Sequence, residues 1–87
     1  MNTKKNEAKK ENTVIVYSTP TCPYCNYTKE YFRQTGVAFE DVDVSKSRER
    51  AVEMVRKSGQ MGVPVIDING AIVVGFQPEA FEELLER

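Results

Sequence analysis

The hydrophobic and polar positions of this chain change their period along the sequence and predict a strand, a helix and a second strand in its first half. Residues 14–17 are all apolar, which is typical of a strand covered on both faces, so we expect a strand over residues 13–18. Residues 24–35 place their apolar side chains on one helical face, and Gly36 supplies the C-terminal cap. Apolar and polar positions alternate over residues 37–44, which predicts the second strand.

A second helix follows this strand. It is predicted to begin at Ser45 or Ser47, both good N-cap residues, and to reach about residue 58, where Gly59 stops it. We expect its apolar stripe to pack into the core, and this stripe consists of Ala51, Val52 and Val55.

The clearest local pattern is a β-hairpin near the C-terminus. Asn69-Gly70 separates two apolar runs, residues 64–68 and 71–74, and this dipeptide favours a type I′ turn between antiparallel strands. Pro78 then opens a last helix, whose apolar face is formed by Phe81, Leu84 and Leu85. The predicted order is β-α-β-α-β-β-α, an α/β fold in which the first two strands are joined by a right-handed parallel crossover.

Composition indicates one small globular domain, because the chain has 87 residues, 40% of them hydrophobic. Its net charge of -1 argues against nucleic-acid binding through a basic field. Residues 1–12 carry almost no apolar side chain, so we expect a disordered tail ahead of a domain over residues 13–87. No run approaches the ~18 apolar residues of a membrane span, and the tail lacks the apolar core of a signal peptide. We therefore expect a soluble, cytoplasmic monomer.

The candidate chemistry lies in Cys22 and Cys25, the only cysteines of the chain. Pro23 marks the first turn of a helix, so Cys22 is expected at its start and Cys25 one turn inside it, within reach of a reversible disulfide. Unpaired N–H groups and the helix dipole lower the pKa of a thiol in that position, which makes Cys22 the expected nucleophile. Cys25, shielded against the sheet, is expected to keep a higher pKa and to act as the resolving thiol that breaks a mixed disulfide formed at Cys22. The chain has no histidine, so activation has to come from backbone dipoles, a lysine or a partner.

Two other uses of this cysteine spacing compete with redox chemistry. A zinc site needs four ligands, and the chain offers two cysteines and no histidine. A purely structural disulfide closes too small a loop to constrain the unfolded chain much. In a reducing compartment, two close cysteines are more often catalytic than structural, which favours a redox role.

Two motifs carry a family resemblance: Cys22-Pro23-Tyr24-Cys25 after the first strand and Gly62-Val63-Pro64 before the third. With them, residues 13–87 resemble the glutaredoxin branch of the thioredoxin superfamily. The resemblance implies a thioredoxin-like fold, with a four-stranded mixed sheet flanked by three helices. It also implies that Pro64 is cis and faces the dithiol, that the backbone of Val63 pairs with a substrate cysteine, and that Tyr24 contributes to the rim of the site.

The sequence departs from the glutaredoxin pattern at two places that bear on glutathione. Many members carry a lysine three residues before the first cysteine, where it meets a glutathione carboxylate, and this chain has Thr19. They also carry Gly-Gly and an acidic residue before the last helix, whereas this chain has Gly75, Phe76, Gln77 and Pro78. That segment resembles the Gly-Phe-x-Pro of glutaredoxin-like redoxins that serve ribonucleotide reductase and are recycled by thioredoxin reductase. We take Thr19, Gly75, Phe76 and Gln77 as candidate substrate-binding residues.

The resemblance implies a dithiol–disulfide oxidoreductase that carries electrons to protein disulfides or glutathione mixed disulfides through Cys22 and Cys25. We expect no bound cofactor and no metal, with glutathione or thioredoxin reductase as electron donor. The expected partners are disulfide-containing proteins, glutathione and a reductase flavoenzyme, with no nucleic acid and no membrane. The alternatives are a glutathione-independent redoxin recycled by thioredoxin reductase, a non-enzymatic iron–sulfur or metal-binding module bridged by Cys22 of two subunits, and an adaptor whose thiols are incidental.

Overall fold

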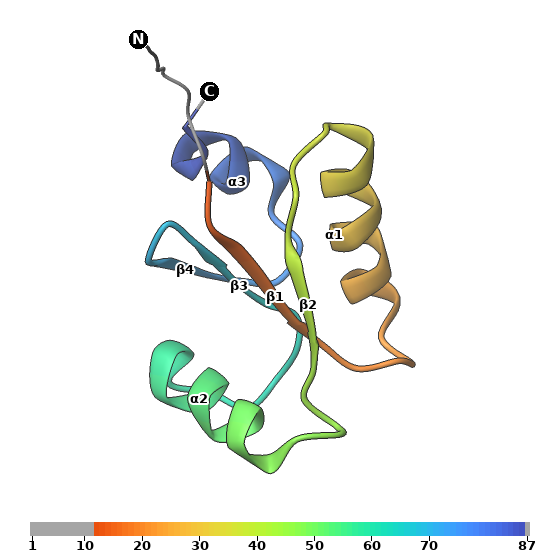
Figure 1. Cartoon of the computed structure of the whole chain (residues 1–87), viewed down its shortest axis with the longest axis vertical. Helices are drawn as coiled ribbons and strands as arrows, with labels where there is room; N and C mark the ends of the chain where they lie inside the picture. The colour runs from red at the N-terminus through yellow and green to blue at the C-terminus, as the bar shows by residue number, and fades with distance from the viewer. Residues whose placement is uncertain (1–11, 87) are drawn as a thin grey trace, which may run out of the picture.

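Four strands form one mixed sheet in the computed structural model, which describes residues 12–86 (Figure 1). The strands are β1 (Val14–Ser18), β2 (Glu40–Asp43), β3 (Val65–Ile68) and β4 (Ala71–Val74), in the order β2-β1-β3-β4 across the sheet. β1 is parallel to β2 and antiparallel to β3, and β3 is antiparallel to β4. The predicted β-α-β-α-β-β-α order and the four-stranded mixed sheet are confirmed.

Helices cover both faces of this sheet. α1 (Pro23–Gln34) and α3 (Pro78–Leu84) pack on the face that carries Val14 and Val16, whereas α2 (Arg48–Ser58) packs on the face that carries Tyr17. Successive residues of a strand point to opposite faces, so cover on both sides explains the continuous apolar run of β1. The core under α1 and α3 consists of Val14, Val16, Phe32, Ile66, Ile68, Val73, Phe81 and Leu85.

Local capping chemistry sets the ends of α2. Ser47 is the N-cap, because its Oγ accepts a hydrogen bond from the backbone N–H of Arg50 at 3.2 Å. Ser45, the other candidate, instead donates its hydroxyl to Asp43 Oδ1 at 2.6 Å. Gly59 ends the helix in the left-handed conformation at φ 76°, as predicted.

β2 is shorter than the predicted strand over residues 37–44. The backbone N–H of Val37 donates to the carbonyl of Phe32 at 2.8 Å, which closes a turn after α1 and keeps this part of the chain off the sheet. Pairing with β1 runs only from Ile15 opposite Glu40 to Ser18 opposite Asp43. The alternating pattern therefore extends beyond the residues of β2 that pair with β1.

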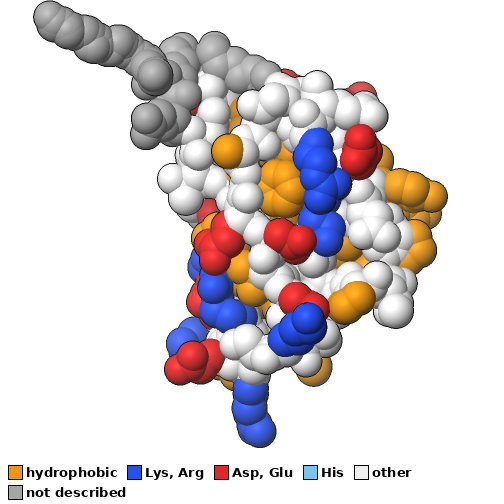
Figure 2. All heavy atoms as spheres, turned by 45° about the vertical axis from the view of Figure 1, so that its right-hand side comes forward, with side chains coloured by type: hydrophobic (Ala, Val, Ile, Leu, Met, Phe, Trp, Pro, Cys, Tyr) orange, Lys and Arg blue, Asp and Glu red, His pale blue; other side chains and the backbone are white. Residues whose placement is uncertain are grey.

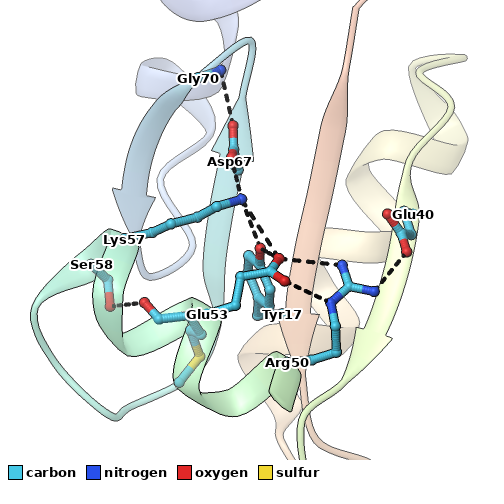
Figure 3. Close-up of polar contacts among 9 residues, drawn as sticks. Tyr17, Glu40, Arg50, Glu53, Lys57, Ser58, Asp67 and Gly70 are labelled. Atoms are coloured by element: carbon cyan, nitrogen blue, oxygen red, sulfur yellow. Dashed lines mark hydrogen bonds and ion pairs between the residues drawn. The ribbon is translucent and has the colours of Figure 1, made fainter. Parts of the chain in front are cut away.

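The predicted core-facing stripe of α2 is only partly correct, because Val55 packs against the core cluster on this face of the sheet but Val52 does not. Met54 is the buried residue of this helix, at 2% exposure, whereas Val52 is 43% exposed. Ala51 and Val55 are only half-buried. The sheet side of α2 carries charged residues whose partners lie on the sheet, and this turns part of the apolar stripe outward (Figure 3).

Side-chain hydrogen bonds join the two ends of the described chain. Residues 1–11 of the predicted tail lie outside the described residues, but Asn12 lies within them. Its Oδ1 accepts from the backbone N–H of Glu86 at 2.7 Å, and its Nδ2 donates to the Glu86 carbonyl at 3.0 Å. Asn69, in the hairpin turn, donates to Asn12 Oδ1 at 2.9 Å. Within residues 12–86, no helix has the length and apolar character needed to cross a bilayer.

Candidate active site

Cys22 is the N-cap of α1, and Pro23 occupies the first turn of that helix, as predicted. Its Sγ accepts a hydrogen bond from the backbone N–H of Cys25 at 3.1 Å, so one of the orphan donors of the helix end points at the sulfur. The backbone N–H of Cys22 donates to the Thr19 carbonyl at 3.4 Å, which folds the loop from β1 back on itself. Both cysteines are free thiols.

Cys25 lies beneath Cys22 and is fully buried, whereas Cys22 is half-exposed. Burial raises the pKa of the Cys25 thiol to about 12, and its hydrogen bond with Cys22 adds to this rise. A backbone hydrogen bond from Thr19 and the positive charge of Lys29 oppose the rise. The predicted contrast between an accessible and a shielded cysteine is confirmed.

The loop before β3 faces the dithiol from the other side of the site. The Val63–Pro64 peptide bond is cis, as the resemblance implied. Cys22 Sγ lies 4.0 Å from the Val63 carbonyl oxygen, and Pro64 is buried. The Pro64 carbonyl accepts from the backbone N–H of Gly75 at 2.9 Å, which attaches the segment after β4 to the same region.

A row of aromatic rings borders the dithiol on the side of α1. Tyr24 is 61% exposed and its ring meets that of Tyr27 at 5.6 Å, edge to face. The ring centroid of Phe76 lies 6.2 Å from that of Tyr27 and 6.3 Å from that of Tyr31. Tyr27 was not among the predicted site residues, although its i,i+3 spacing from Tyr24 on α1 could have indicated it.

The remaining predicted residues differ in what their side chains reach. Gln77 donates its Nε2 to the Val74 carbonyl at 2.7 Å and so holds its own loop. Thr19 touches the site through its backbone. Among residues 12–86, no group of three or more His, Cys, Asp or Glu residues could hold a metal ion.

A free dithiol at the start of α1, next to a cis-proline loop that leads into the central part of a four-stranded mixed sheet, is typical of a thiol-disulfide oxidoreductase of the thioredoxin fold. A model of the glutaredoxin family matches residues 14–73, and the chain belongs to this family. It is 46% identical over 74 residues to a glutaredoxin-like 8.6 kDa protein in a rubredoxin operon of Clostridium pasteurianum, covering 85% of this chain and 99% of that protein.

Solved structures give the same assignment. The thioredoxin-like protein BC3987 superposes with a TM-score of 0.77 and 33% identity, over 83% of this chain and 99% of that chain. The glutaredoxin-like NrdH-redoxin of Escherichia coli is described as having a thioredoxin-like activity profile. It superposes with a TM-score of 0.75 and 27% identity, and the match covers 86% of this chain and 97% of that chain. The protein is therefore a glutaredoxin-like redox protein.

Proposed function

We propose that the protein reduces disulfides in two steps, with Cys22 as the nucleophile and Cys25 as the resolving thiol. The Cys22 thiolate attacks one sulfur of a substrate disulfide, forms a mixed disulfide and releases the other sulfur as a thiolate. The Cys25 thiolate then attacks Cys22 Sγ, which expels the second substrate thiolate and leaves Cys22–Cys25 oxidised by two electrons. The half-exposed position of Cys22 above the fully buried Cys25 is the observation that supports this proposal.

Val63 is proposed to align the substrate. Its carbonyl lies 4.0 Å from Cys22 Sγ, and β3 begins only at Val65, so the backbone of Val63 lies outside the sheet ladder. An extended substrate segment can pair with such a backbone, as strands added to a sheet edge do. This would hold the substrate sulfur beside Cys22, with Tyr24 and Phe76 on the rim.

The electron donor that we propose is a flavoenzyme of the thioredoxin reductase type. The cation expected for a glutathione carboxylate is missing at Thr19, so a replacement would have to come from a neighbouring helix. Lys29 is 13% exposed and paired with Asp41 at 3.1 Å. Lys57 is paired with Asp67 at 2.7 Å, and α2 places it on the other face of the sheet. Neither lysine is left over for glutathione, and Arg56, a third cation on a neighbouring helix, lines a separate groove on α2.

The γ-glutamyl end of glutathione also lacks the acidic partner that the family pattern supplies for its ammonium group. Phe76 and Gln77 stand where the family pattern has an acidic residue, Gln77 is bonded to Val74, and Pro78 has no backbone N–H to donate. The likeness to the NrdH-redoxin of Escherichia coli agrees with a thioredoxin-like donor. We further propose that the protein acts as an electron carrier in the cytoplasm, where free dithiols persist.

The test is NADPH consumption with bis(2-hydroxyethyl) disulfide, comparing thioredoxin reductase alone with glutathione plus glutathione reductase. We expect turnover with thioredoxin reductase at least as fast as with glutathione. Thr19→Lys should raise the glutathione rate roughly tenfold or more, since a charge-assisted hydrogen bond is worth about 1.5–3 kcal/mol. Thr19→Gln is the uncharged control and should not. Efficient turnover through glutathione and none through thioredoxin reductase would overturn the donor and leave the cysteine roles intact.

A further inference from the structure

The outer side of α2 carries an apolar groove that the chemistry at Cys22 does not use. The groove has a volume of about 280 Å³. Val52 and Met61, two of its lining residues, are 43% and 81% exposed. The full lining is Arg48, Ala51, Val52, Val55, Arg56 and Met61.

The charged residues on the two sides of α2 differ in whether they form ion pairs. On the sheet side, Arg50 pairs with Glu53 at 3.1 Å and with Glu40 at 3.2 Å, and Lys57 pairs with Asp67 (Figure 3). In the groove, Arg48 and Arg56 make no ion pair with any other residue from 12 to 86. Both arginines are exposed.

The geometry of α2 puts these two arginines at opposite ends of the groove. They are eight residues apart on one helix, which corresponds to about 12 Å along its axis at ~1.5 Å per residue. Glu49, in the first turn of α2, lines the adjoining hollow with them, so the balance of charge around this surface remains positive. An apolar floor with a cation at each end is complementary to aliphatic side chains flanked by carboxylates.

Met61, at the edge of the groove, lies two residues before Val63 of the active site. The Gln60 side chain bonds both backbone groups of Gly62, at 2.8 Å and 3.2 Å, and so closes a turn that presents Met61 outward. Val63, two residues further on, lies against Cys22 Sγ. Two residues span at most about 7 Å, so an extended substrate bound at Cys22 reaches the groove within a few residues of its cysteine.

We propose that this groove is the docking surface for client proteins that carry leucine-like side chains flanked by Asp or Glu next to their reactive disulfide. The proposal rests on the proposed function and names the class of client. The net charge of the chain is only -1, so its overall field does not attract such a segment, and the local arrangement of Arg48 and Arg56 favours it.

The probes are three fluorogenic disulfide peptides that differ only in the residues on both sides of the disulfide: Glu-Leu-Leu-Glu, Lys-Leu-Leu-Lys and Glu-Ser-Ser-Glu. The reduced full chain is mixed with each oxidised peptide, and the rate of peptide reduction is measured. We expect the second-order rate constant for the acidic leucine peptide to exceed those of both others by about tenfold, since it alone gains burial and ion pairing together. Equal rates for the three peptides with the unmodified protein would overturn the proposal without any variant.

Variants assign the preference to the groove. Arg48→Glu with Arg56→Glu should reverse the preference between the acidic and basic leucine peptides, and Val52→Gln should remove the advantage of leucine over serine. Arg33→Glu reverses the charge of an exposed arginine on α1, outside the groove; it is the charge-reversal control and should change neither ratio. Unchanged ratios in the double arginine variant would overturn the proposal.

Reduction of bis(2-hydroxyethyl) disulfide, which is too small to reach the groove, is followed in parallel. Its rate should be the same in every variant. Failure with this small disulfide in the unmodified protein would refute the proposed function itself, and normal reduction of it without peptide preference would refute only the groove.

Discussion

At the residue scale, the surroundings of Cys25 determine when this thiol reacts. Burial raises its pKa to about 12, so the thiol is protonated at neutral pH and does not compete with Cys22 for an incoming disulfide. Once Cys22 is part of a mixed disulfide, Cys25 has to lose its proton in order to attack. In the proposed mechanism, the order of the two steps therefore follows from the burial of the Cys25 sulfur beneath that of Cys22.

This order predicts unequal effects of the two serine substitutions. Cys22→Ser removes the accessible sulfur and should abolish reduction of any disulfide. Cys25→Ser leaves attack possible but removes the resolving thiol, so a mixed disulfide with the substrate should accumulate. Non-reducing gels and intact mass measure the adduct. Protein-disulfide reduction that survives Cys22→Ser but not Cys25→Ser would reverse the assignment.

The pH dependence of the second step should respond to Lys29, four residues after Cys25 on α1. Its positive charge lowers the pKa of Cys25, so Lys29→Met should raise that pKa and slow resolution at neutral pH. A partly exposed charge is worth up to about 1 kcal/mol, which corresponds to about fivefold in rate. Lys29→Arg retains the charge and should retain the rate.

The measurement is the decay of a preformed mixed disulfide against pH. In Lys29→Met, the decay of the mixed disulfide should become fast only at a higher pH than in the wild type. Asp41→Asn removes the carboxylate paired with Lys29, so the decay should become fast at a lower pH. Identical profiles for all variants would show that Lys29 has no influence on Cys25.

The sequence predicted the two cysteines well because the relevant chemistry is local. A first-turn proline, a helix N-terminus and one turn of spacing all lie between residues 22 and 25. The spacing from Tyr24 could have indicated Tyr27, but the ring contact of Tyr27 and the ion pair of Lys29 depend on distant segments. Phe76 comes from the loop after β4, and Asp41 comes from β2.

At the element scale, polar contacts fix α2 on the sheet. Tyr17 in β1 donates to Glu53, and this hydrogen bond lowers the pKa of the Glu53 carboxyl. Lys57 donates to Tyr17 at 2.8 Å and to Asp67 in β3 at 2.7 Å. Burial opposes the charge of Lys57, but the bonds to Asp67 and Tyr17 outweigh this and raise its pKa.

Lys57→Met should therefore destabilise the protein in a pH-dependent way. The pKa of Lys57 is higher in the folded state than in the unfolded state, where it is about 10.4. The protonated lysine therefore stabilises the folded protein fully at pH values below about 10.4, and this contribution is lost as the pH rises through the pKa of the folded state. Loss of hydrogen bonds to a charged group costs about 1.5–3 kcal/mol. The difference in unfolding free energy between wild type and variant should be constant from about pH 7 to 9 and shrink above about pH 10.

Urea unfolding at several pH values measures this difference. Lys46→Met, which removes an exposed lysine from the loop before α2, is the control and should cost little at any pH. A difference that grew above pH 10 would contradict the assignment of Lys57.

The same network explains why the orientation of α2 could not be predicted. Strand and hairpin patterns depend on neighbouring residues, and the turn at Asn69 and Gly70 has the positive φ values, 54° and 94°, that type I′ requires. The side of α2 that faces the sheet depends instead on Tyr17 and Asp67, which lie on separate strands. Apolar periodicity therefore predicted the existence of α2 and the core contact of Val55, but it did not identify Met54 as the buried residue or Val52 as exposed.

At the scale of the whole molecule, charges of both signs are distributed over the surface. On the face drawn in Figure 2, Lys and Arg side chains lie among Asp and Glu side chains, and hydrophobic side chains show both between them and at the right-hand edge. This agrees with the near-neutral total charge. Recognition then depends on local arrangements, of which the groove on α2 is one.

The two ends of the described chain meet on the same side of the molecule, at Asn12. Its side chain bonds both backbone groups of Glu86, and Asn69 joins it from the hairpin turn while accepting from the Thr13 N–H at 2.9 Å. Asn69 also donates to the Leu84 carbonyl at 3.2 Å. One cluster of amides thus connects the start of β1, the β3–β4 turn and the end of α3.

This cluster predicts a sharp boundary for what the fold needs at its N-terminus. Deletion of residues 1–11, which leaves Asn12 in place, should change the melting temperature by less than about 5 °C, because these residues have almost no apolar side chains to bury. Asn12→Ala in the full chain should cost about 1 kcal/mol, or about 4–8 °C in a domain of this size. Asn12→Asp keeps the acceptor for Glu86 and loses the donor, so its melting temperature should lie between those of Asn12→Ala and wild type. Thermal unfolding followed by circular dichroism gives all four values, and a larger loss from the deletion than from Asn12→Ala would show that residues 1–11 contribute contacts of their own.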